Sequence, residues 1–79
     1  MIIRYTVEYT EEIKARYVDT KEYPNSEKIK ITFESEDKNQ YSRFFLIDQS
    51  DFIFNRLLEN ENAVFKLKIN NRKQIVDIR

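Results

Sequence analysis

The sequence predicts an α+β fold that is predominantly antiparallel β: a small, partly closed barrel of about six strands with one short helix near residues 49–59. Three observations lead to this class. Apolar and polar residues alternate with a period of two along most of the chain. A single stretch late in the chain has helical spacing instead. The length of 79 residues leaves room for one domain, spanning residues 1–79.

The N-terminal part of the chain is predicted to be mostly strand. Residues 3–9 alternate β-branched and aromatic residues with polar ones, as a half-buried strand does. Residues 11–18 allow two interpretations, because Ile13, Ala15 and Tyr17 alternate as in a strand, whereas the preceding threonine could cap a short helix. We favour the strand.

A loop and a hairpin are expected next. Residues 19–27 contain the only proline and predict an irregular surface loop. Residues 28–33 and 41–47 predict two strands joined by a turn near residues 37–39. Because residues 44–47 are apolar on both faces, we expect the second strand to lie centrally in the sheet.

A short helix and a second hairpin complete the chain. Asp48 is expected to cap the helix at its N-terminus. The apolar stripe of this helix should pack on the sheet, and it consists of Ile53, Phe54, Leu57 and Leu58. Residues 64–69 and 74–78 alternate again and predict two strands joined by an asparagine turn.

The order of these elements is typical of two classes of small barrel, the SH3-like and the OB-type modules. If residues 11–18 were helical, the order βαββαβ would instead be that of a ferredoxin-like sandwich. Both comparisons concern element order alone, and fold does not determine function.

Glycine, cysteine and histidine are all absent, and their absence excludes much known chemistry. Without glycine there is no P-loop, Rossmann fingerprint or nucleophile elbow, and asparagine or aspartate, chiefly asparagine, is expected wherever a turn needs a positive φ. Without cysteine and histidine there is no disulfide, zinc site or imidazole base. The cluster Glu34, Glu36 and Asp37 is interpreted as a solvated turn. We therefore expect no catalytic residue, metal, cofactor or small-molecule substrate, and no enzyme.

Charge and hydropathy predict a cytoplasmic protein without a membrane partner. Lysine and arginine number 14 and the acidic residues also number 14, so the formal net charge is zero. No window approaches the ~18 apolar residues of a membrane span, and the N-terminus lacks the pattern of a signal peptide.

The aromatic content indicates a first hypothesis, a non-enzymatic protein-interaction module. Such a module would act as an inhibitor or an accessory protein, for example of a mobile element, and would occlude a macromolecular partner or pair with a second copy of itself. Exposed tyrosines and apolar strand residues are enriched at interfaces. The candidate anchors are Tyr17, Tyr23, Tyr41, Phe44 and Leu46.

The alternative hypothesis is a single-stranded DNA or RNA binder. Residues 63–79 hold five cations and one carboxylate, and so a C-terminal hairpin would present the candidates Lys66, Lys68, Arg72 and Lys73. Phosphates and stacked bases could both be held if Lys28 and Lys30, or Lys14 and Arg16, lay beside this hairpin with an exposed tyrosine. The zero net charge weighs against this hypothesis, and strand lysines also serve to prevent edge-to-edge pairing.

Overall fold

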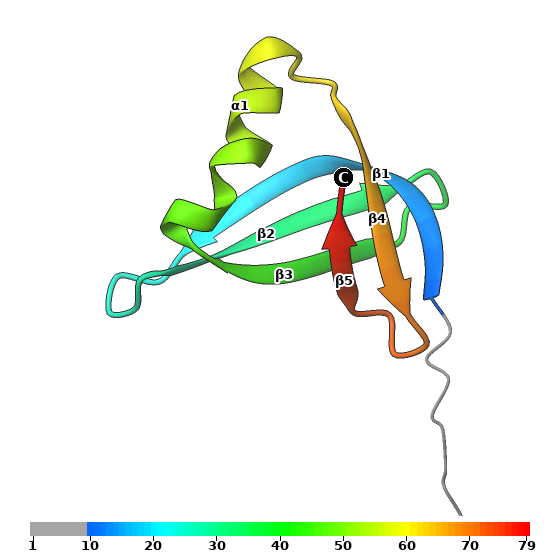
Figure 1. The fold of residues 1–79 in the computed structure, drawn as a ribbon, viewed down its shortest axis with the longest axis horizontal. Coiled ribbons are helices and arrows are strands. Elements are labelled where there is room, and N and C mark those ends of the chain that lie inside the picture. The colour runs from blue at the N-terminus through cyan, green and yellow to red at the C-terminus, as the bar shows by residue number, and fades with distance from the viewer. Residues whose placement is uncertain (1–9) are drawn as a thin grey trace, which may run out of the picture.

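Five antiparallel strands curl into a half-barrel with one short helix in the computed structural model, which describes residues 10–79 (Figure 1). The elements, in chain order, are β1 (Thr10–Glu22), β2 (Lys28–Ser35), β3 (Gln40–Leu46), the 3-10 helix η1 (Ile47–Ser50), α1 (Asp51–Glu59), β4 (Val64–Asn70) and β5 (Ile75–Ile78). The order across the sheet is β3-β2-β1-β4-β5. The prediction of a small β-rich domain with one helix is confirmed, and the strand predicted for residues 3–9 lies outside the described residues.

The central strand β1 pairs with a neighbour on each side. Residues 10–16 pair with β4 and residues 15–22 pair with β2. A register shift between Tyr17 and Asp19 marks a bulge, which bends the strand between its two partners. The preference for a strand over residues 11–18 is thus confirmed and the ferredoxin-like alternative does not hold. Because β1 continues to Glu22, the predicted loop shrinks to residues 23–27.

The prediction that residues 44–47 form a central strand is wrong, because β3 lies at an edge of the sheet. Of these four residues only Phe45 is buried, whereas Phe44 is 55% exposed. Ile47 is not in the strand and begins the 3-10 helix. An apolar run on both faces therefore reflects an uncovered outer surface here and not burial on two sides.

The core lies on the inner face of the sheet, where β1, β2 and β4 contribute alternate residues. Phe33 of β2 and Phe65 of β4 are fully buried and meet edge to face, with their ring centroids 5.3 Å apart. The buried hydrophobic residues are Ala15, Ile29, Ile31, Phe33, Tyr41, Phe45, Ile53, Ala63, Phe65, Leu67, Ile69, Ile75 and Ile78.

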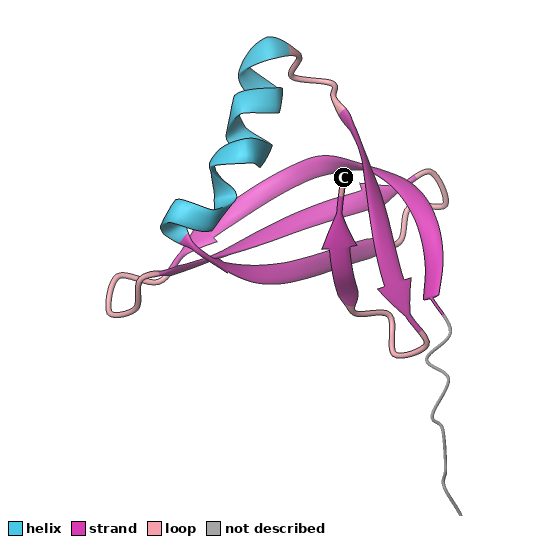
Figure 2. Cartoon of the chain, in the orientation of Figure 1, coloured by secondary structure: helices cyan, strands magenta, loops and turns pink. Residues whose placement is uncertain are grey.

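Helix α1 connects β3 to β4 at one end of the half-barrel (Figure 2). Its stripe is narrower than predicted, because Ile53 is buried and Phe54 is half-buried but Leu58 is 85% exposed. The expected cap at Asp48 is also wrong. The 3-10 helix occupies that position, and the N-cap residue is Ser50, whose hydroxyl donates to the Ile47 carbonyl at 2.7 Å and not to the helix.

The two hairpin turns form without glycine, and both use the same backbone conformation. In the β2–β3 turn the N–H of Lys38 donates to the Ser35 carbonyl at 2.9 Å, and residues 70–74 repeat this pattern in the β4–β5 turn. Three-residue loops of this kind need a left-handed residue at their third position, which is usually glycine. Lys38 and Lys73 take that conformation here, with φ of 63° and 62°.

The expectation that asparagine would supply the positive φ is therefore wrong for the described residues. Asparagine contributes through its side chain instead. The Asn70 Oδ1 accepts from the N–H groups of Arg72 and Gln74 at 3.0 and 2.9 Å, and the Asn60 Oδ1 accepts from the N–H of Asn62 at 3.0 Å. These are side-chain turns that fold the backbone without a left-handed asparagine.

We predict that Lys38→Gly raises the free energy of unfolding by about 1 kcal/mol, because glycine lacks the Cβ that makes the left-handed region costly. Thermal unfolding should shift upward by about 4–8 °C for a chain of this size. Lys38→Ala is the matched control, since it removes the same side chain but keeps the Cβ. An equal shift in both variants would contradict the explanation.

Candidate functional site

The outward face of the sheet, defined as the face opposite the core, carries most of the basic residues of the molecule. Directly paired residues of antiparallel strands point to the same side, so the register assigns each charged residue to a face. The outward cations are Lys14, Arg16, Lys21, Lys28, Lys30, Lys66, Lys68 and Arg79, and the outward carboxylates are Glu12, Asp19, Glu34 and Asp77.

Eight cations against four carboxylates give the outward face a net charge of +4. Because the whole chain is neutral, the remainder of the molecule carries −4. The zero net charge therefore conceals a separation of charge between the sheet face and the rest of the protein.

Three cations stand side by side across β1, β4 and the C-terminal residue, and we call them the cation row: Lys14, Lys66 and Arg79. Lys14 and Lys66 are directly paired. Lys66 and Arg79 exchange two backbone hydrogen bonds of 2.8 Å, so they are also directly paired and their side chains point to the same side of the sheet. Among the described residues, no acidic side chain is paired directly with any of the three across the strands.

The pairing of Lys14 with Lys66 is unfavourable for the fold. Because Lys66 directs its backbone groups toward Arg79, its pair with Lys14 is of the non-hydrogen-bonded kind, in which the two Cα atoms are only about 4.5 Å apart. Like charges directly opposite each other destabilise a sheet. Arg79 also forms a weak ion pair with Asp77, in which Nε and Oδ2 are 3.5 Å apart and both side chains are exposed.

The residues predicted to bind nucleic acid lie in different surroundings. Lys66 belongs to the cation row, but Lys68 is paired with Glu12 on one side and Asp77 on the other, so its charge is balanced. Arg72 and Lys73 lie in the β4–β5 turn, beyond this balanced row. The hairpin therefore does not present its four cations together.

A second group, which we call the ring cluster, lies at the other end of the outward face. It consists of Tyr23 and Phe44 with Lys21, Lys28 and Lys30. The two ring centroids are 5.6 Å apart, and the Lys21 Nζ lies 5.6 Å from the centroid of the Tyr23 ring. Lys30 lies between Phe44 and Lys21 on neighbouring strands, and Lys28 is paired with Leu46.

The predicted protein-binding residues separate into an exposed and a buried set. Tyr23, Phe44 and Leu46 come together on the outward side of β3, beside Ile47, which is 56% exposed. Tyr41 lies in the core and is 8% exposed.

Tyr17 also turns inward, where its ring meets Phe54 edge to face at 6.4 Å. The Tyr17 hydroxyl is hydrogen-bonded to the Thr20 hydroxyl at 2.6 Å. We therefore do not retain Tyr17 and Tyr41 in a docking surface.

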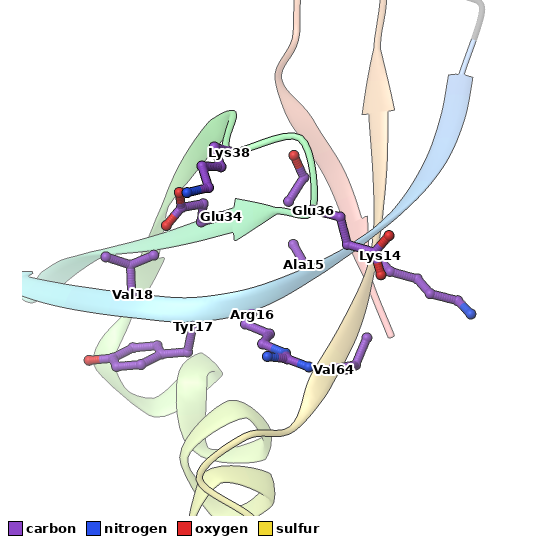
Figure 3. A pocket seen from close by; sticks show the side chains of 10 residues that line it. Lys14, Ala15, Arg16, Tyr17, Val18, Glu34, Glu36, Lys38 and Val64 are labelled. Atoms are coloured by element: carbon purple, nitrogen blue, oxygen red, sulfur yellow. The ribbon is translucent and has the colours of Figure 1, made fainter.

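A depression of about 440 Å³ lies where β1 runs beside β2 and meets β4 (Figure 3). Its lining mixes both signs of charge with valine, and includes Lys14, Arg16, Glu34, Lys38, Val18 and Val64. No group of three metal-ligating residues gathers anywhere within residues 10–79. This lining offers no arrangement that would select a particular small molecule.

No protein-family model, curated protein or solved structure matches this chain. In the part of the chain that the structure describes, no helix is long and apolar enough to cross a membrane. The case for a function therefore depends on the geometry and charge of the outward face.

We predict opposite effects on stability for two neighbouring lysines of β4. Lys66→Gln should raise the free energy of unfolding by about 0.2–1 kcal/mol because it removes a like-charge contact, and Lys68→Gln should lower it by a similar amount because it removes two favourable ones. Urea titrations at low salt measure both. The difference should shrink at about 1 M salt, where the screening length falls to about 3 Å. Shifts of the same sign would contradict the assigned register.

Proposed function

We propose that this protein is a non-enzymatic, cytoplasmic module that binds single-stranded DNA or RNA with the outward face of its sheet. The observation that carries the proposal is the +4 charge of that face next to one exposed and one partly buried aromatic ring, Phe44 and Tyr23. A polyanion gains from neutralising such a face, whatever the net charge of the whole molecule is. The charge separation thus removes the main objection to this hypothesis.

The ring cluster supports a single-stranded ligand in particular. Phe44 is 55% exposed and Tyr23 is partly buried, and each ring has a lysine beside it, Lys30 at Phe44 and Lys21 at Tyr23. Every base has a face that can stack on an aromatic side chain, at about 1–3 kcal/mol per base, while lysines hold the phosphates. In a duplex these base faces are already stacked on one another, so a sheet surface with rings favours an unpaired strand.

The element order supports the same proposal by analogy. The structure is a five-stranded half-barrel in the order β3-β2-β1-β4-β5 with a helix between β3 and β4, and we compare it by analogy with the partly open barrel of the OB type. OB-type modules bind oligonucleotides and oligosaccharides on the surface of their second and third strands. In this analogy the corresponding residues are Lys28 and Lys30 of β2 and Phe44 of β3.

A protein-interaction module, including a homodimer, is the second candidate. Leu46 and Ile47 favour it, because they are 40% and 56% exposed and base stacking does not require aliphatic side chains. The backbone groups of Phe44 and Leu46 point away from β2, since the odd-numbered residues of β3 make the hydrogen bonds to β2. An extended segment of a partner could pair with this edge.

We predict that Phe44→Ala and Tyr23→Ala each weaken binding to a mixed-sequence single-stranded oligonucleotide. The loss should correspond to about 1–3 kcal/mol, which is roughly fivefold to more than a hundredfold in Kd. Fluorescence anisotropy at about 50 and 200 mM salt measures it, because phosphate contacts make binding steeply salt-dependent. Phe52→Ala is the control, since Phe52 is also exposed, at 42%, but lies on α1. Absence of saturable binding at the lower salt would refute the proposal.

The second candidate makes a different prediction. If the aliphatic patch is a protein interface, the double substitution Leu46→Ser and Ile47→Ser abolishes association with the partner, or with a second copy, and leaves oligonucleotide affinity unchanged. Sedimentation equilibrium over a range of protein concentrations tests the homodimer directly. We expect a monomer whose mass does not change with concentration. A mass that rises toward twice the chain mass, and returns to one chain in the double variant, would favour the protein interface instead.

A further inference from the structure

We infer that the cation row is a second phosphate-binding site, and that a bound strand runs from the ring cluster across β1 to Lys14, Lys66 and Arg79. This inference rests on the proposed function and extends it from one end of the outward face to the other. It assigns the two ends different tasks, with base stacking at the rings and backbone contact at the row.

The row is suited to phosphates and not to bases. The outward positions around it belong to β1, β4 and β5, and no aromatic residue is among them. Their neighbouring outward residues on β4 are Val64 and Lys68. A strand passing over this region would therefore meet positive charge without a ring on which a base could stack.

The like-charge contact gives the row a physical reason to bind an anion. Lys14 and Lys66 are held at the shortest cross-strand spacing, and Arg79 lies opposite Lys66. Without a ligand Lys14 and Lys66 repel each other, while Asp77 partly offsets the charge of Arg79. A phosphate between them replaces this repulsion with charge-assisted hydrogen bonds, so the arrangement that costs stability in the free protein favours the complex.

The two ends of the face are separate sites. Lys14 and Lys21 lie seven residues apart on β1, which corresponds to at most about 23 Å of strand at ~3.3 Å per residue. Between them the outward face is neutral or acidic, because Arg16 is paired with Glu34 and Asp19 follows. A ligand must be long enough to contact both ends at once. A trinucleotide has only two phosphates between its nucleosides and cannot serve both ends while its bases stack on the rings, whereas a 12-mer is long enough to reach both.

The test compares the protein with the double variant Lys14→Gln and Lys66→Gln on two ligands, a single-stranded trinucleotide and a single-stranded 12-mer. We expect the variant to bind the 12-mer about tenfold to a hundredfold more weakly at 50 mM salt, and the slope of log affinity against log salt to fall by about 1.4, or ~0.7 for each lost contact. Trinucleotide affinity, followed by NMR titration, should stay the same. The matched control, Lys68→Gln with Arg72→Gln, removes the same charge outside the row and should change the slope less.

The outcomes separate the inference from the proposed function. If the double variant keeps the affinity and salt slope of the unmodified protein for the 12-mer while the ring variants lose binding, the row is not a phosphate site, although the proposed function stands. If neither oligonucleotide binds, the proposed function fails as well. If poly-glutamate displaces the 12-mer as effectively as unlabelled single-stranded DNA does, the row serves an acidic protein partner and the inference is overturned. A melting temperature at or above that of the unmodified protein shows that any lost binding is not unfolding.

Discussion

The double pairing of β1 is the constraint on which the rest of the structure depends. One strand can serve two neighbours at an angle only if it bends sharply, and the bulge at Val18 provides the bend. The bulge also reverses the alternation of the strand. Before it the odd-numbered residues Ala15 and Tyr17 face the core, and after it Lys21 faces outward, opposite Lys30. Without the extra residue Lys21 would point inward, and the ring cluster would lose the lysine that lies over Tyr23.

The sequence determines the local elements more reliably than their placement in the sheet. The period of two over residues 28–33 and 64–69 locates two of the core strands, because alternation reports directly on burial of one face. It does not locate β3 at the edge. An apolar run such as residues 44–47 has the same pattern whether protein covers its outer side or a ligand does. The helix start also depends on context, since the 3-10 turn ending at Ser50 displaces the cap expected at Asp48.

The candidate site could be predicted only in part, because it is formed by register. Tyr23 and Tyr41 are the same residue type, yet the first lies on the outward surface and the second in the core. The cation row joins Lys14 to Lys66, which are 52 positions apart, and no local pattern shows that they will be paired. A sum of charges over segments likewise assigns Lys68 to a basic hairpin, although its cross-strand neighbours neutralise it.

A neutral protein whose positive charge is gathered on one face attracts a polyanion differently from a basic protein. A basic domain attracts nucleic acid from all directions and coats duplex and single strand alike, since that attraction depends on charge and not on sequence or structure. Here the attraction is concentrated on the +4 outward face, because the rest of the chain carries a net charge of −4. Long-range attraction is correspondingly small and is screened beyond about 10 Å at 0.1 M salt. Under the function that we propose, binding would depend on close contact with the rings and the cation row, and a ligand that offers phosphates without accessible bases would gain only part of the available free energy.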